Sequence, residues 1–76
     1  MNINKTVDAV GMLCPMPILK TVQAVKEMKV GEVLEIAATD EGIKKDIKNW
    51  CDMMGHELID IQDKDNKIIV HLKKLK

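Results

Sequence analysis

The sequence predicts an α+β domain, a two-layer sandwich in which two helices cover one face of a four-stranded mixed sheet, in the order β-α-β-α-β-β. Three observations carry this prediction: short stretches with alternating apolar residues, two segments with apolar residues at helical spacing, and a polar turn before the last strand. Because each helix has a single apolar stripe, two layers are the simplest packing. A chain of 76 residues has room for one hydrophobic core, so we expect residues 1–76 to form a single domain.

The first strand is expected over residues 3–10, where side chains alternate between two faces. One of these faces carries Ile3, Lys5, Val7 and Ala9. Gly11 breaks the alternation, and a short apolar loop of Met12 and Leu13 leads to Cys14.

A helix is expected directly after this cysteine. Apolar residues recur at helical spacing, namely Ile18, Leu19, Val22, Val25 and Met28. Proline is tolerated in the first helical turn, because its missing N–H would have no partner there. We therefore expect Pro15 and Pro17 at the first and third helical positions, Cys14 at the N-cap, and Gly31 at the end of the helix.

Residues 32–39 are the second expected strand, with Leu34, Ile36 and Ala38 on one face. Asp40 suits the N-cap of a second helix, and Glu41 in the first turn would complement its dipole. The apolar stripe of this helix consists of Ile43, Ile47, Trp50, Cys51 and Met54. Gly55 is expected to end the helix.

The last two strands are expected over residues 57–62 and 67–73, and residues 63–66 between them have the composition of a turn. They should form a hairpin. The chain has six methionines and one aromatic residue, Trp50, so the core is expected to be aliphatic.

Composition excludes several classes of protein. The formal net charge is zero and all 12 basic residues are lysines, which argues against nucleic-acid binding. No apolar run approaches the roughly 20 residues of a membrane span. The first residues lack the apolar segment of a signal peptide, so we expect a cytoplasmic protein with no membrane partner, whose two cysteines are thiols.

Cys14 is the residue best placed for chemistry. At a helix N-terminus, free N–H groups and the helix dipole favour a thiolate, so we expect a lowered pKa, with the amide of Met16 as the donor to the sulfur. The two neighbouring prolines would fix the direction of the side chain. The alternative from residue chemistry alone is that Cys14 is a small apolar residue filling a loop.

The apolar neighbours of this cysteine, Met12, Leu13 and Met16, would form an adaptable docking patch if they are exposed. Alternatively, one or two of them cover the core. Cys51 lies on the apolar stripe of the second helix and is expected to be a buried core thiol. Three lysines of that helix are expected to form a solvated face, with partner docking as the alternative: Lys44, Lys45 and Lys48.

His56 and His71 could join the cysteines in a metal site, but the chain has no CxxC or HxxxH spacing. We therefore expect no metal and no bound cofactor. A phosphate loop and a GxGxxG motif are also absent from the sequence.

Residues 8–17, Asp-Ala-Val-Gly-Met-Leu-Cys-Pro-Met-Pro, resemble the CPxP signature of the TusA/SirA-type sulfur-carrier family. Further matches follow in the right order over essentially the whole chain: Gly31-Glu32, Thr39-Asp40, Asp46-Ile47, Trp50-Cys51 and the run from Gly55 to Leu58. The family fold is a two-layer β-α-β-α-β-β sandwich, in agreement with the fold predicted from the residues.

The resemblance implies a persulfide carrier without its own small-molecule pocket. Cys14 would receive sulfur from a protein donor, such as a cysteine desulfurase or a rhodanese, and relay it to a cysteine of an acceptor protein, with Pro15 and Pro17 as scaffold. Family members serve tRNA thiolation, molybdenum-cofactor maturation, sulfur oxidation or selenium metabolism. Some carry a basic residue where this chain has Leu13, which could change the partner. We expect the chain to act as a monomer.

Two other functions compete with this reading. The element order also resembles the RNA-binding C-terminal domain of a bacterial translation initiation factor, although zero net charge and the lack of arginine oppose RNA binding. A thiol redox protein would use Cys51 as the resolving partner of Cys14, which the expected burial of Cys51 opposes.

Overall fold

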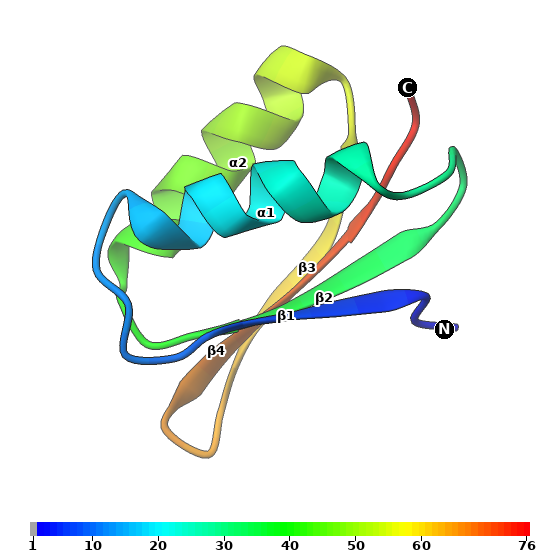
Figure 1. Ribbon diagram of the computed structural model, residues 1–76. Coiled ribbons are helices and arrows are strands. Elements are labelled where there is room, and N and C mark those ends of the chain that lie inside the picture. Colours follow the sequence, from blue (N-terminus) through cyan, green and yellow to red (C-terminus); the bar gives the residue numbers. More distant parts are fainter. Residues whose placement is uncertain (1) are drawn as a thin grey trace.

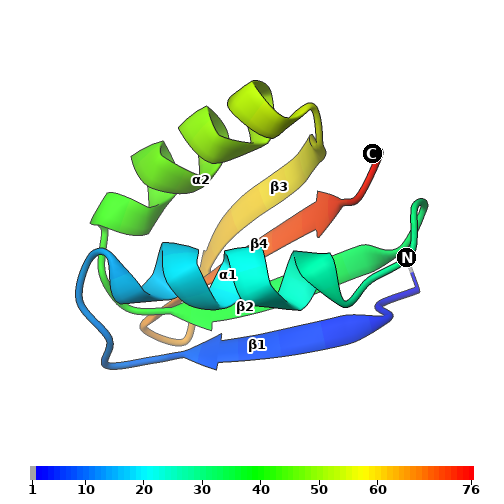
Figure 2. The same cartoon turned by 45° about the horizontal axis from the view of Figure 1, so that its top comes forward.

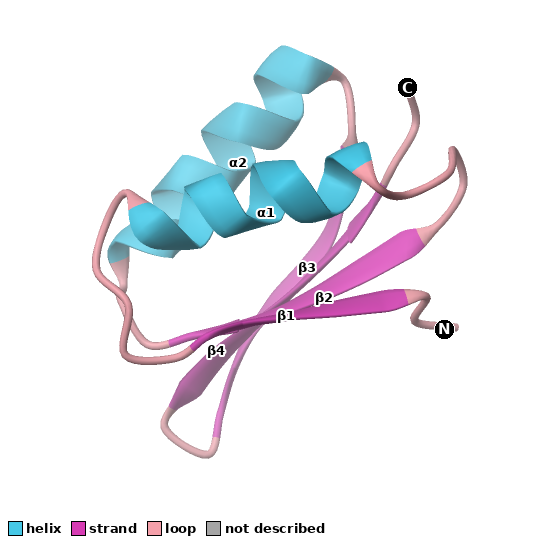
Figure 3. Ribbon diagram, in the orientation of Figure 1, coloured by secondary structure: helices cyan, strands magenta, loops and turns pink. Residues whose placement is uncertain are grey.

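Four strands form one sheet, and two helices lie on one of its faces (Figures 1 and 3). The computed structural model describes residues 2–76. Its elements are β1 (Lys5–Ala9), α1 (Met16–Lys26), β2 (Val33–Ala38), α2 (Gly42–Met54), β3 (Glu57–Lys64) and β4 (Lys67–Lys73). The predicted fold class is confirmed. Neither helix of this part of the chain has the length and apolar character that crossing a membrane requires.

The strand order is β1-β2-β4-β3, with β1 parallel to β2 and β4 antiparallel to both of its neighbours. Because β1 and β2 are parallel and adjacent, they end at the same edge of the sheet. The loops that lead into α1 and α2 therefore leave that edge together, while both chain termini lie at the opposite end (Figures 1 and 2).

The core lies between the sheet and the helices and is aliphatic, as predicted. Its largest fully buried side chains include Leu34 and Ile36 of β2, Ile47 of α2, and Val70 and Leu72 of β4. The predicted inner face of the second strand is thus confirmed.

The helical stripes differ from the prediction at their ends. Leu19 is exposed, and α1 instead turns Thr21 and Ala24 to the core; the Thr21 hydroxyl donates to the Pro17 carbonyl over 2.8 Å, which satisfies it inside the core. On α2, Trp50 is half-buried and Met54 is exposed. The apolar residues at these positions cover the edges of the core or face solvent.

Helix α1 ends at Lys26, well before Gly31, so the predicted end is wrong. The Lys74 ammonium group donates to the carbonyls of Val25 and Met28 over 2.8 and 2.7 Å. The Val25 carbonyl also accepts the Met28 N–H over 3.1 Å, so Lys74 adds a second donor there and fixes the C-terminal segment to the end of the helix. The contact comes from the far end of the chain, so no local sequence signal announces it.

The hairpin is tighter than predicted, because β3 continues to Lys64. Only Asp65 and Asn66 form the connection, and both have positive φ angles, 53° and 62°. Two residues in this conformation are typical of the turn whose twist matches that of paired strands, and Asp and Asn tolerate it.

His71 lies on the sheet face away from the helices and is only 8% exposed. Its Nδ1 lies 2.7 Å from Asp60 Oδ1, and its Nε2 lies 3.0 Å from Glu35 Oε1. Burial acts to lower the pKa of His71, but the two carboxylate hydrogen bonds outweigh it and the pKa is raised. The hydrogen bond from His71 in turn lowers the pKa of Asp60.

Protonated His71 is expected to stabilise the fold at low pH. Its contribution is complete below the ordinary histidine pKa of about 6.5 and is lost as the pH rises through the raised value of the folded state. The pKa of His56 is lowered, so His56 changes the stability with pH in the opposite sense. The contribution of His71 is therefore measured as the difference in the free energy of unfolding between wild type and His71→Gln. Urea unfolding over a pH series should give a difference of about 1 kcal/mol at low pH that shrinks as the pH rises; a constant difference would contradict this.

Candidate functional site at the edge shared by β1 and β2

The two loops at this edge are joined by hydrogen bonds. The Gly11 N–H donates to the Thr39 hydroxyl and the Cys14 N–H donates to Asp40 Oδ2, each over 2.9 Å. The other oxygen of Asp40 accepts the Gly42 N–H over 3.0 Å. Asp40 thus fixes the cysteine loop to the start of α2, and these two N–H bonds lower the pKa of its carboxyl group. It stands one residue before the N-cap, Glu41, so its predicted capping position is wrong by one residue.

Cys14 lies just outside α1 rather than at its N-cap. The helix begins at Met16, with Pro15 at the N-cap and Pro17 at the second helical position, so all three predicted positions shift by one. The Met16 N–H, which we expected to reach the sulfur, donates to the Leu13 carbonyl over 2.9 Å.

The exposed Cys14 sulfur instead donates to Asp46 Oδ2 of α2 over 3.4 Å. This hydrogen bond is the largest of the causes that raise the pKa of Cys14; partial desolvation and the negative charges of Asp46 and Asp40 add to it. The predicted lowering of the pKa is therefore wrong, because carboxylates rather than helix amides surround the sulfur. The resting form of this cysteine is a thiol.

Asp46 is the site residue that reasoning from sequence missed. The sequence gives Asp46 a place only in the family resemblance, and it gives Asp40 a place in that resemblance and as a helix cap. One signal was available: α2 turns Ile43 and Ile47 to the core, and Asp46 precedes Ile47 in the early turns of the helix. Since the parallel pairing of β1 and β2 brings the start of α2 beside the cysteine loop, a carboxylate there can reach Cys14.

Exposed apolar side chains lie just before Cys14 in the chain and in the first turns of α1. Leu13, Met16 and Leu19 are 74%, 46% and 52% exposed, and we call these three residues the apolar patch. Met12, which was predicted to belong to this patch, packs against the core instead. Of the predicted patch residues, Leu13 and Met16 are therefore exposed.

Cys51 differs from Cys14 in its burial. It is 1% exposed, as predicted, and burial together with the charge of Asp52 raises its pKa to about 11. Both cysteines are free thiols. A buried, weakly acidic thiol cannot act readily as a resolving partner, which weakens the redox alternative.

The histidine side chains have partners other than the two thiols. The His56 ring lies 5.3 Å from that of Trp50, and its Nδ1 accepts the Leu75 N–H over 3.2 Å. Within residues 2–76, no three His, Cys, Asp or Glu side chains come together in a way that could hold a metal ion.

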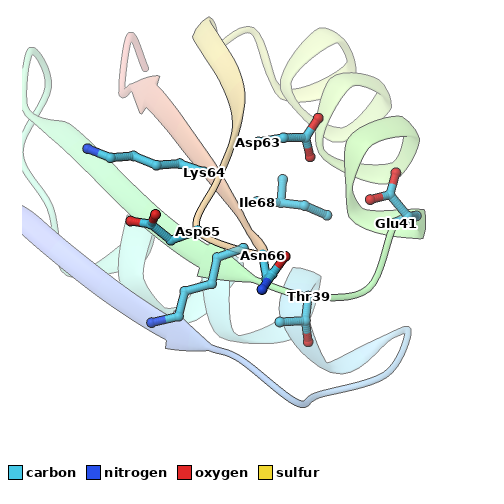
Figure 4. A pocket seen from close by; sticks show the side chains of 8 residues that line it. Thr39, Glu41, Asp63, Lys64, Asp65, Asn66 and Ile68 are labelled. Carbon is cyan, nitrogen blue, oxygen red and sulfur yellow. The ribbon is translucent and has the colours of Figure 1, made fainter.

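An open hollow lies between the start of α2 and the β3–β4 hairpin (Figure 4). Lys44 bridges two acidic residues of its wall, Glu41 at 2.9 Å and Asp63 at 3.1 Å, so this lysine is paired rather than simply solvated. Cys14 does not line this hollow. The thiol therefore faces solvent outside it.

A comparison with protein families shows which family the chain belongs to. The family profile described as "Sulfurtransferase TusA" matches residues 5–74, which span all six elements. The chain belongs to the TusA family.

Individual relatives in the TusA family are similar over most of their length. "Putative sulfur carrier protein YrkI" of Bacillus subtilis is 43% identical over 63 residues, which cover 83% of this chain and 84% of that protein. "Sulfur carrier protein TusA" of Pseudomonas syringae is 31% identical over 74 residues, covering 97% of this chain and 88% of that protein. A crystal structure of a SirA-like protein from Desulfitobacterium hafniense shares the fold, with a TM-score of 0.85, 24% identity, and coverage of 96% of this chain and all of that chain.

Proposed function

We propose that this protein is a sulfur carrier that holds the transferred sulfur as a persulfide on Cys14. The observation that carries the proposal is the exposed Cys14 thiol, held on a loop that two backbone-to-side-chain hydrogen bonds fix to the start of α2. Membership of the TusA family and the sulfur-carrier names of its relatives support it.

The transfer step conserves atoms and electrons. The Cys14 sulfur attacks the outer sulfur of a donor persulfide, R–S–S–H, and a new S–S bond forms. The donor's own S–S bond breaks, its electron pair stays on the donor sulfur, and that sulfur takes up the proton that Cys14 releases. No net oxidation or reduction occurs. In the delivery step the Cys14 persulfide is the donor, and the thiol of the acceptor protein attacks its outer sulfur.

An exposed thiol suits exchange between proteins better than turnover of a small molecule. Because Cys14 protrudes into solvent, a partner can enclose the sulfur in its own active site. We propose a protein donor of the cysteine desulfurase or rhodanese class and a protein acceptor with a reactive cysteine. Persulfide chemistry needs a reduced thiol, which fits the reducing cytoplasm.

Mass spectrometry of the intact protein tests the proposal. After incubation with a cysteine desulfurase and cysteine, the wild-type chain is expected to gain the mass of one sulfur atom, and a reductant should remove it. Peptide mapping should place that sulfur on Cys14. No gain of mass with several donors, or a gain on Cys51, would contradict the proposal.

The apolar patch is expected to serve partner docking. Replacing Leu13 with Asp should slow loading by a protein donor several-fold, because an exposed anchor at an interface is replaced by a charge. Labelling of Cys14 by iodoacetamide should change much less. Val30→Asp is the matched control, since Val30 is similarly exposed, at 65%, in the loop after α1. Equal loading of the Leu13 variant and wild type would contradict a docking role.

A further inference from the structure

The charge around the Cys14 sulfur comes from α2 and the residues just before it. Asp46, half-buried on α2, accepts the S–H hydrogen bond, and Asp40 accepts the backbone N–H of the same cysteine. Of the three lysines in this part of α2, Lys44 is paired with Glu41 and Asp63, while Lys45 and Lys48 are exposed to solvent. The described charges that act on the sulfur are therefore the two carboxylates of Asp40 and Asp46.

We propose that Asp46 positions the Cys14 sulfur and favours the protonated form of both the empty thiol and the loaded persulfide, an inference that rests on the proposed function. In the empty carrier the Asp46 carboxylate accepts the S–H bond and fixes the direction of the side chain. A thiol held in this way resists unwanted alkylation and oxidation, because the thiolate is the reactive form.

The same carboxylate stands beside the loaded persulfide, Cys14–S–S–H. A persulfide anion is a nucleophile, whereas the protonated form is open to attack at its outer sulfur. The negative charge of Asp46 opposes ionisation of the persulfide and so favours the form that can be delivered.

Delivery then proceeds with Asp46 as the positioning residue. The acceptor thiol loses a proton and attacks the outer sulfur, forming its own S–S bond as the Cys14–S bond to that sulfur breaks. The electron pair stays on the Cys14 sulfur, which takes up one proton and donates to Asp46 again. Protons and electrons balance, and no oxidant is needed.

Alkylation over a pH series tests the coupling without any persulfide. In Asp46→Asn, iodoacetamide should label Cys14 several-fold faster at neutral pH, and the labelling profile should move to lower pH. Asp52→Asn is the control, because it removes the same charge from the exposed side of the same helix; it should follow wild type. Asp46→Glu, which keeps the charge, should restore much of the wild-type profile. An unchanged profile in Asp46→Asn overturns the inference.

Delivery is measured on protein loaded with inorganic polysulfide and mixed with a small thiol such as N-acetylcysteine. Asp46→Asn should release its sulfur several-fold more slowly than wild type, although its empty thiol is more reactive; equal or faster release overturns the role in delivery. Thermal melts identify a variant that has lost its fold. If Asp46→Asn is unfolded, the pH profile of Cys14 labelling in Asp46→Glu decides whether the carboxylate controls the thiol. If wild type takes up no sulfur, the proposed function fails while the alkylation result still decides whether Asp46 controls the thiol.

Discussion

Cys14→Ser is expected to abolish persulfide loading and to leave the fold intact. Serine cannot form a persulfide, so no other group replaces the sulfur. The side chain is exposed outside α1, and a serine hydroxyl can donate to the carboxylate of Asp46 as the thiol does, so the free energy of unfolding should change little.

Intact mass after incubation with a sulfur donor, together with a thermal melt, measures both parts of this prediction. The Cys51→Ser variant is the internal control, because it retains Cys14 and should still load. A Cys14→Ser protein that gains and transfers sulfur would show that another residue is the carrier.

Cys51→Ser is expected to lower the free energy of unfolding while sulfur transfer persists. The side chain is 1% exposed inside an aliphatic core, where an unpaired hydroxyl costs roughly 1–3 kcal/mol. That is a large part of the stability available to a domain of this size. Urea unfolding of wild type, Cys51→Ser and Cys51→Ala separates the penalty of a polar atom from that of lost volume. A serine variant as stable as wild type would mean that its hydroxyl finds a backbone partner.

The fold class could be predicted because its signals are local and repeated. The strand around Ile36 and the helical stripe from Ile43 to Cys51 show the right periods, and both are buried as expected. The turn before β4 was also evident from composition, although Asp65 and Asn66 alone form it. The alternation of buried and exposed positions is a pattern of residues close together in the chain, so it can be recognised from the sequence.

The environment of Cys14 could not be predicted in the same way. Helix α1 starts one residue later than predicted, so Pro15 rather than Cys14 occupies the N-cap. The exact position of a helix cap depends on tertiary contacts as well as on proline. The dominant contact, from Cys14 to Asp46, joins residues 32 positions apart. This contact is the main reason that the pKa of Cys14 is raised rather than lowered. It can be anticipated only when β1 and β2 are known to be parallel neighbours.

The placement of both termini at the end opposite Cys14 has a practical consequence for tethering (Figure 2). The first strand begins there at Lys5, and the last strand leads there to Lys74, whose N–H donates to the Glu32 carbonyl over 3.0 Å. A purification tag, a surface linker or a second protein domain joined to either terminus would therefore point away from the thiol. The carrier can be immobilised or fused at either end with Cys14 still open to a partner.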